Sequence, residues 1–142
     1  SERGKTNPAW CGNPEQLDEL PGPTTQWVDG RTFFAGHHRS NFGHVLLEVL
    51  PRFWPDLDYR DFDALLFHPQ RAGRRVSWLE PKSYAEELLG AATGGSQAQL
   101  RIVAREPLRI AEVTVASPAF WLKRGFSPQV RTAFDRVADR LT

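Results

Sequence analysis

The chain has 142 residues, of which 18 are basic and 17 are acidic, so its formal net charge is +1. This length is enough for about one domain with a real core, and so balanced a charge provides no bulk attraction to nucleic acid or to an anionic membrane. Cys11 is the only cysteine and cannot form a disulfide within the chain, so nothing indicates an oxidising compartment. We therefore expect a cytoplasmic protein that binds no nucleic acid and contacts a membrane at most peripherally, at its inner face.

The first part of the chain differs in composition from the rest. Residues 1–24 are rich in Pro, Gly and Asn and show no sustained periodicity, which predicts an irregular lead-in anchored to the core by Trp10 and Trp27. From Arg31 onward, patterns typical of strands alternate with patterns typical of helices. We expect residues 25–142 to form one α/β domain.

The first strand and helix of this domain contain most of the candidate chemistry. Residues 32–35 predict a short strand, which is followed by a polar loop over residues 36–40 and by a helix from about Asn41. Pro51 cannot donate a backbone hydrogen bond, so the helix is predicted to end or kink near Leu50. An apolar stripe at helical spacing is predicted to face the core, and its members are Phe42, Val45, Leu46, Val49, Leu50 and Phe53.

The remaining elements follow in order. Residues 62–67 predict a buried strand that ends in a turn at residues 68–70. A helix is predicted from Pro81 to a stop at Gly90, and a connector of small residues follows it. Two strands are predicted over residues 100–104 and 108–116. A last helix is predicted with Ser127 as its cap and Pro128 in its first position, and its predicted buried face consists of Val130, Phe134, Val137 and Leu141.

Strands that alternate with helices favour a mostly parallel sheet with flanking helices, and we expect a Rossmann-like unit. In such sheets ligands bind at the carboxyl ends of the strands, where loops meet the N-termini of helices. His37 and His38 follow the first predicted strand, and His68 follows the second. The sequence therefore predicts a binding site at this edge.

A second polar group lies along the helix after the first strand. Asn41, His44, Glu48 and Arg52 fall on one arc of the helical wheel, apart from the apolar stripe. Glu48 is four residues after His44 and can orient the imidazole and raise its basicity, as a general base requires. A surface pair with the same spacing, or Asn41 and His44 serving only to cap and tether the helix, remains the structural alternative.

Other chemistries find less support in the sequence. Imidazoles and a carboxylate can bind zinc, but their spacing matches no metal motif, so we expect no metal. The chain also lacks the glycine-rich loops that bind nucleotide phosphates. Trp121 is predicted to lie in a loop after a strand, and its ring is a candidate to contact the apolar face of a sugar.

Residues 41–52 read Asn-Phe-Gly-His-Val-Leu-Leu-Glu-Val-Leu-Pro-Arg. Preceded by a strand with a small last residue and a polar loop, this segment resembles the signature of the family 61 glycosyltransferases, the group of capsular polysaccharide biosynthesis. In that family the pattern is approximately Asn-aromatic-x-His-x-x-x-Glu/Asp-x-Leu-Pro-Arg. The resemblance extends over about residues 31–141, and only the segment 41–52 is specific.

The resemblance implies an inverting transfer of a sugar from a nucleotide-sugar donor to a glycan or polysaccharide acceptor. It implies a GT-B fold of two Rossmann-like domains, in which this segment is the acceptor-side domain and the nucleotide-sugar domain is expected after residue 142. His44, oriented by Glu48, would be the base or would position the acceptor. Other expected substrate-binding residues are His37, His38, Asn41, Arg52, His68 and Trp121, with Arg52 bracing Glu48 or the donor phosphates. A non-catalytic glycan-binding or interaction module without a donor domain is the alternative.

Overall fold

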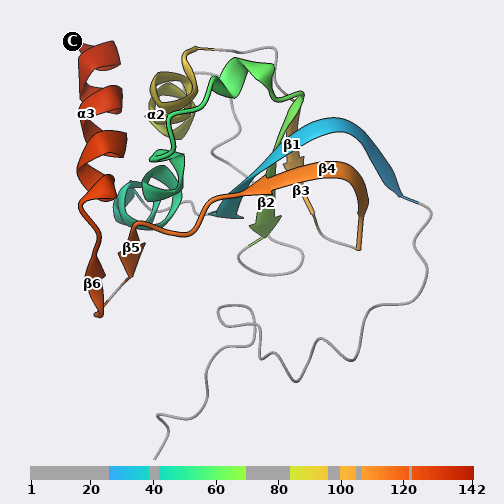
Figure 1. Ribbon diagram of the computed structural model, residues 1–142, viewed down its shortest axis with the longest axis horizontal. Coiled ribbons are helices and arrows are strands. Elements are labelled where there is room, and N and C mark those ends of the chain that lie inside the picture. Colours follow the sequence, from blue (N-terminus) through green and yellow to red (C-terminus); the bar gives the residue numbers. More distant parts are fainter. Residues whose placement is uncertain (1–25, 39–41, 70–83, 96–99, 105–106, 122) are drawn as a thin grey trace, which may run out of the picture.

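The computed structural model describes residues 26–38, 42–69, 84–95, 100–104, 107–121 and 123–142. The predicted lead-in, with Trp10, lies outside these residues, as do Asn41 and Pro81. The described part is an α/β structure built on a four-stranded sheet in the order β3-β2-β1-β4, and every neighbouring pair in this sheet is parallel. The prediction of a parallel sheet with helices is confirmed at this level (Figure 1).

The four strands have different lengths. They are β1 (Trp27–His38), β2 (Ala64–Pro69), β3 (Leu100–Val103) and β4 (Arg109–Val115). Because β1 lies between β2 and β4, the direction in which strands are added reverses beside β1, and this reversal defines the topological switch point. Between β3 and β4 the chain has only residues 104–108, fewer than the roughly dozen residues of a helical crossover.

Strand β1 is longer than predicted at both ends. The expected loop at residues 36–40 was wrong for its first three residues, because Gly36, His37 and His38 pair with β2. The expected turn at residues 68–70 was wrong for the same reason, because His68 and Pro69 are strand residues. Pairing with a parallel neighbour thus outweighs the turn preference of Gly and Pro, and Pro69 is tolerated at the end of its strand. Trp27 begins β1 and is 60% exposed, so its predicted role as an anchor was wrong.

The helix after β1 is irregular. It begins as α1 (Phe42–His44), continues as a π-helix, η3 (Val45–Val49), and ends as a 3-10 helix, η4 (Leu50–Phe53). The helix was predicted to end or kink near Leu50, and the π-helical segment does end at Val49, after which the chain changes its helix type and continues as η4. The N–H of Leu50 donates to the carbonyl of Val45, five residues back, and Pro51 then occupies the first turn of η4, where no N–H is needed.

Helix α2 (Tyr84–Thr93) runs through Gly90, which was predicted to stop it. The residues after Gly90 were predicted to be a connector, but Ala91, Ala92 and Thr93 are helical and buried. Burial of these small side chains outweighs the helix-breaking preference of one glycine, which costs about 1 kcal/mol relative to alanine.

Helix α3 (Gln129–Leu141) is close to its predicted position, but its predicted cap was wrong, because Pro128 and not Ser127 is the residue before its first turn and no side chain caps it. On its predicted face Val137 is buried, but Leu141 is 48% exposed, because the last turn extends beyond the core. A two-stranded antiparallel hairpin, β5 (Phe120–Trp121) with β6 (Gly125–Phe126), precedes α3 and was not predicted. Strands of two residues show too little periodicity to be recognised in a sequence.

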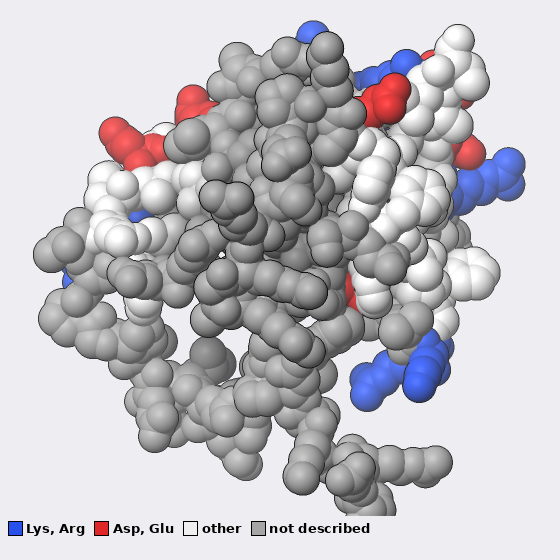
Figure 2. All heavy atoms as spheres, turned by 180° about the vertical axis from the view of Figure 1, so that it is seen from behind, with Lys and Arg blue, Asp and Glu red and all other residues white. Residues whose placement is uncertain are grey.

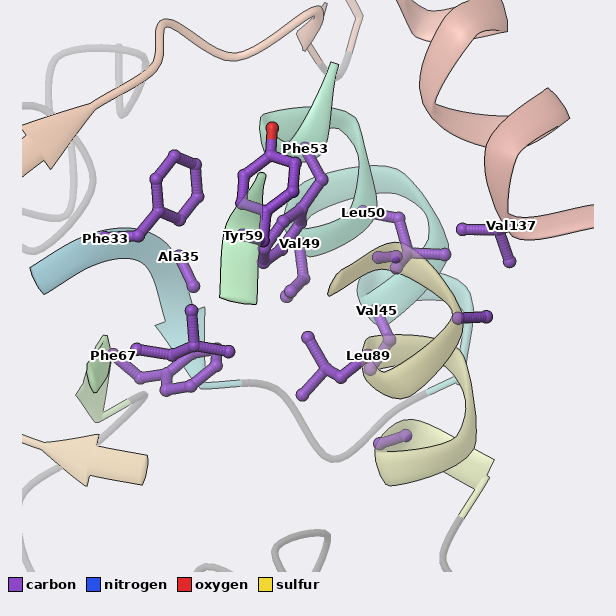
Figure 3. Close-up of a cluster of buried hydrophobic side chains, with 14 of the residues drawn as sticks. Phe33, Ala35, Val45, Val49, Leu50, Phe53, Tyr59, Phe67, Leu89 and Val137 are labelled. Atoms are coloured by element: carbon purple, nitrogen blue, oxygen red, sulfur yellow. The ribbon is translucent and has the colours of Figure 1, made fainter. Parts of the chain in front are cut away.

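The helices gather beside one another on one side of the sheet (Figure 1). The core between them contains a cluster of rings in which Phe33 of β1 lies 5.1 Å from both Phe53 and Tyr59, measured between ring centroids. Tyr59 belongs to a short 3-10 helix, η5 (Tyr59–Asp61), and its ring points into this cluster (Figure 3). Further buried side chains complete the core, among them Ala35, Val45, Val49, Leu50, Phe67, Leu89 and Val137.

The predicted apolar stripe of the helix is largely confirmed by this core. Val45, Val49, Leu50 and Phe53 are fully or almost fully buried. Phe42 is the exception, because it is 53% exposed and its ring lies 5.4 Å from the ring of Tyr84. Among the described helices, none is both long enough and apolar enough to cross a bilayer.

Candidate functional site

The imidazole of His44 is hydrogen-bonded to a carboxylate on the next turn of the helix. His44 Nδ1 lies 2.9 Å from Glu48 Oε1, and the side chain of His44 is 40% exposed whereas that of Glu48 is 15% exposed. An ionised carboxylate can only accept, so Nδ1 donates and Nε2 of the neutral ring keeps its lone pair. The pair therefore presents a partly exposed base that is oriented by a more buried acid.

Glu48 belongs to the π-helical segment η3. Helical segments of this type are rare and often mark functional sites. Here the wider turn also carries the chain toward Pro51 and η4, which position the next member of the polar arc, Arg52. The same local irregularity thus places both Glu48 and Arg52.

The guanidinium of Arg52 lies at the topological switch point of the sheet. Its Nη1 donates to the carbonyl of Ala116, the residue after β4, over 3.2 Å. Its central carbon lies 5.3 Å from the centroid of the Phe34 ring in β1, a cation–π arrangement. Burial lowers the pKa of Arg52, and the negative charge of Glu48 opposes this effect. Arg52 therefore ties the helical segment to the carboxyl ends of β1 and β4.

Gly36 makes this position of Arg52 possible. Its φ is +92°, and a Cβ on it would lie 2.5 Å from Arg52 Nε. Any other residue would be strained at this φ and would also displace the guanidinium. Arg52 Nε is buried and has no hydrogen-bond partner among the residues that the structure describes. The missing side chain at Gly36 thus leaves the space through which Arg52 crosses β1.

Two of the predicted histidines meet at the ends of β1 and β2. His37 pairs with His68 in the parallel register, and their ring centroids are 6.1 Å apart. The ring of His68 also packs edge-on against Phe34 at 5.3 Å. Burial lowers the pKa of His68, and the positive charge of Arg52 lowers it further. Both effects favour the neutral imidazole of His68, which can both donate and accept a hydrogen bond.

Several of the predicted residues are linked in pairs, by a hydrogen bond, a ring contact or an electrostatic effect. Glu48 is bonded to His44 and influences Arg52 electrostatically, and Arg52 in turn influences His68 beside His37. His38 belongs to this edge by its backbone, through its pairing with Pro69. Asn41 lies outside the described residues.

Trp121 is a strand residue of β5, so its predicted place in a loop was wrong. It is 43% exposed, and its strand lies against η3, the segment that contains Glu48. Contact of this ring with a sugar stays a prediction.

Sequence reasoning missed the residues that hold Arg52. Neither Phe34 nor Gly36 was singled out. A glycine within a strand is nevertheless a signal that another group approaches the backbone closely, and Gly36 lies directly before His37 and His38. A further tie, from Trp54 Nε1 to the carbonyl of Ser117 over 2.8 Å, fixes the chain after β4 beside η4. A sequence does not indicate which backbone carbonyls, such as those of Ala116 and Ser117, accept hydrogen bonds from side chains.

In the described ranges, no three His, Cys, Asp or Glu side chains are grouped as ligands for a metal ion. Comparisons of the chain with protein-family models, with curated proteins and with solved structures found no match.

Proposed function

We propose that this chain is the acceptor-side, Rossmann-like half of an inverting GT-B glycosyltransferase, which moves a sugar from a nucleotide-sugar donor to a glycan or polysaccharide acceptor. The observation that carries the proposal is the hydrogen bond between His44 Nδ1 and Glu48 Oε1. It occurs within a segment that resembles the family 61 signature, beside an arginine at the topological switch point, where α/β sheets bind their ligands.

In the proposed reaction, Nε2 of His44 takes the proton of an acceptor hydroxyl. The oxygen then attacks the anomeric carbon of the donor from the face opposite the leaving group, and the bond to the nucleoside diphosphate breaks with its electron pair. The proton stays on His44 as an imidazolium, which the carboxylate of Glu48 stabilises. Glu48 thus has two roles. It fixes the tautomer of His44 before the reaction and stabilises the positive charge of His44 after it.

The neighbouring residues are suited to a neutral, hydroxyl-rich acceptor. Neutral imidazoles can donate to one hydroxyl and accept from another, and burial and Arg52 both favour the neutral form of His68. Arg52 already donates to Ala116, so in this proposal it positions Glu48 and the ends of the strands. His37, His38, Asn41 and Trp121 stay proposed acceptor contacts.

The test measures release of nucleoside diphosphate by the natural full-length protein against a panel of nucleotide sugars and glycan acceptors. We expect His44→Ala and Glu48→Gln to lower kcat at least about a hundredfold, the low end of general-base effects. Asp58→Asn is the matched control, because it also converts a carboxylate to an amide but lies in an exposed ion pair with Arg60. It should leave kcat unchanged.

Thermal unfolding of the same variants separates catalysis from a structural role. If His44→Ala lowers the melting temperature but not kcat, then the pair only tethers the helix and the proposal fails. If the wild-type protein binds glycans but releases no nucleoside diphosphate with any donor, then the non-catalytic binding module is correct.

A further inference from the structure

Strand β4 forms one edge of the four-stranded sheet. Among the described residues its neighbour in the sheet is β1, and no strand pairs with its outer side (Figure 1). The backbone N–H and C=O groups on that side form a row of donors and acceptors with which a further β-strand can pair. The edge is open to such a strand, because Val113 is 46% exposed and Val115 is 61% exposed.

The two edges of the sheet differ in their protection against pairing. Strand β3, at the other edge, has only four residues, and short edge strands discourage the addition of another strand. Strand β4 has seven residues, contains no proline or lysine, and is regular, because the extra residue at its register shift lies in β1. The charge of Glu112, in the middle of β4, is balanced by Arg31, whose Nε lies 3.0 Å from Glu112 Oε1. Strand β4 therefore lacks the features that usually keep an edge strand unpaired.

The side chains of β4 differ in chemistry between the two faces of the sheet. Thr114 pairs with Phe33, which packs in the aromatic core, so Val113 and Val115 lie on the opposite face. By the same alternation Ala111 shares the face of the two valines, whereas Glu112 lies on the face of Thr114. Over these five residues β4 has one apolar face and one face with a carboxylate and a hydroxyl.

This pattern makes β4 complementary to itself when two copies run antiparallel. With a two-fold axis at Val113, this valine faces its counterpart and Ala111 faces Val115, so the apolar side chains of both copies share one face. On the other face Glu112 faces Thr114, whose hydroxyl can donate to the carboxylate. An axis at Glu112 would place two carboxylates opposite each other, which is destabilising. The side chains therefore favour the register centred on Val113.

The charge of the molecule does not oppose such an association. The formal net charge of the chain is +1, so two copies repel each other only weakly. Figure 2 shows described basic and acidic side chains at several separate points around the outline of that face, with both signs present. A second copy of the chain is therefore an acceptable partner electrostatically as well as in its strand.

We infer that β4 is the contact strand of a symmetric homodimer, in which a second copy of this chain adds its own β4 in the antiparallel direction, centred on Val113. The two four-stranded sheets then form one continuous sheet. The inference does not depend on the proposed transferase activity. Because the strands of the two copies run in opposite directions, the carboxyl ends of β1, with their candidate sites, point to opposite sides of the joint sheet.

Sedimentation equilibrium of the full chain between about 1 µM and about 1 mM measures the dimerisation. We expect the apparent mass to rise with concentration from 16.1 kDa toward twice this value. Val113→Lys should weaken dimerisation at least about tenfold, because a pair of valines is lost and two like charges face each other. Leu57→Lys is the matched control, since Leu57 is 41% exposed and lies outside the sheet. It should dimerise like the wild type, and circular dichroism should show that both variants are folded.

Disulfide cross-linking tests the register, in a Cys11→Ser background that removes the one native thiol. Residues directly opposite each other in an antiparallel pair have Cα atoms about 4.5–5.5 Å apart, within the range of a disulfide. Val113→Cys should therefore form a covalent dimer under mild oxidation. Val115→Cys should not, since its two copies would lie four residues apart along the strands, more than about 13 Å.

Three results would overturn the inference. The first is a wild type whose mass stays at 16.1 kDa over the whole range of concentration. The second is a folded Val113→Lys variant that associates as strongly as Leu57→Lys. The third is a Val115→Cys variant that cross-links as readily as Val113→Cys.

Discussion

Arg52 crosses strand β1 at Gly36, where a Cβ would lie 2.5 Å from Arg52 Nε. The guanidinium occupies the space of the missing side chain and reaches the carbonyl of Ala116 beyond it. This relationship connects the helix that contains His44 and Glu48 with the ends of two strands. Its disruption should therefore affect both stability and the predicted site.

Gly36→Ala should lower the free energy of unfolding by at least about 2 kcal/mol. The strain of a non-glycine residue at positive φ contributes about 1–2 kcal/mol, and displacement of Arg52 adds to it. Urea unfolding checks this value. The matched control is Gly90→Ala in α2, where a Cβ would meet nothing within 4 Å, so it should stabilise the protein by about 1 kcal/mol. Equal effects at the two glycines would show that Arg52 does not need Gly36.

The charge of Arg52 should be measurable at His68. Arg52→Gln removes a positive charge that lowers the pKa of His68. The pKa of His68 should therefore rise, although burial will still lower it. NMR titration of the histidine ring protons measures the change. Arg60→Gln removes an exposed charge that pairs with Asp58 and should leave the pKa of His68 unaffected. A pKa of His68 that does not move in Arg52→Gln would contradict the electrostatic effect of Arg52.

His68 should also make the stability depend on pH. Its pKa in the folded protein is lowered from the ordinary value of 6.5, so the unfolded chain binds more protons at mildly acidic pH. The stabilisation is full above about pH 6.5 and is lost as the pH falls through the folded pKa. Urea unfolding at several pH values should show this loss in the wild type and a smaller loss in His68→Gln. An equal loss in both proteins would assign the effect to other groups.

Tyr59 makes a different contribution to the core. Its ring packs against Phe33 and Phe53, and its hydroxyl donates to the carbonyl of Pro55 over 2.8 Å. Tyr59→Ala should cost about 3–5 kcal/mol, as expected for the loss of a large buried ring. Tyr59→Phe should cost only about 1 kcal/mol, because Arg136 Nη2 also donates to Pro55. Thermal unfolding of both variants measures the difference, and similar costs would mean that the hydroxyl, not the ring, dominates.

Burial raises the pKa of Tyr59 to about 12. The folded protein therefore holds this proton more strongly than the unfolded chain, whose tyrosine ionises near pH 10. The resulting stabilisation is full below about pH 10 and is lost as the pH rises toward 12. Tyr59→Phe should lose less stability over this range than the wild type, measured by urea unfolding.

The bond between His44 and Glu48 predicts a single tautomer. In the neutral ring the proton should reside on Nδ1, because the carboxylate accepts from it. Nitrogen chemical shifts of His44 measure the tautomer, and Glu48→Gln should populate the other form. A neutral ring that is protonated mainly on Nε2 in the wild type would remove the proposed base.

Most of the architecture could be predicted from local patterns. The apolar stripe from Val45 to Phe53 and the strand over 109–115 follow directly from periodicity. Errors occurred where tertiary contacts outweigh local preference. Strand pairing kept Gly36 and Pro69 in strands, and burial of Ala91 and Ala92 carried α2 past Gly90.

The side chains of the candidate site could be predicted from the sequence, but the contacts that hold them in place could not. His44 and Glu48 were recognisable from their spacing, and His37 and His68 from their places at the ends of strands. The contact of Arg52 with a backbone carbonyl could not be foreseen, since every residue offers one. The hairpin that displays Trp121 was missed because its strands have only two residues each.

The π turn of η3 contains one residue more than an α-helical turn, because the N–H of Leu50 bonds to the carbonyl five residues back instead of four. Leu47 lies within this turn and is 37% exposed. Deletion of Leu47 would let the same turn close as ordinary α-helix and would leave Arg52 facing Gly36. In a regular α-helix the same deletion would turn everything after it by about 100°. This turn is therefore the place in the segment where a change of length should do the least harm.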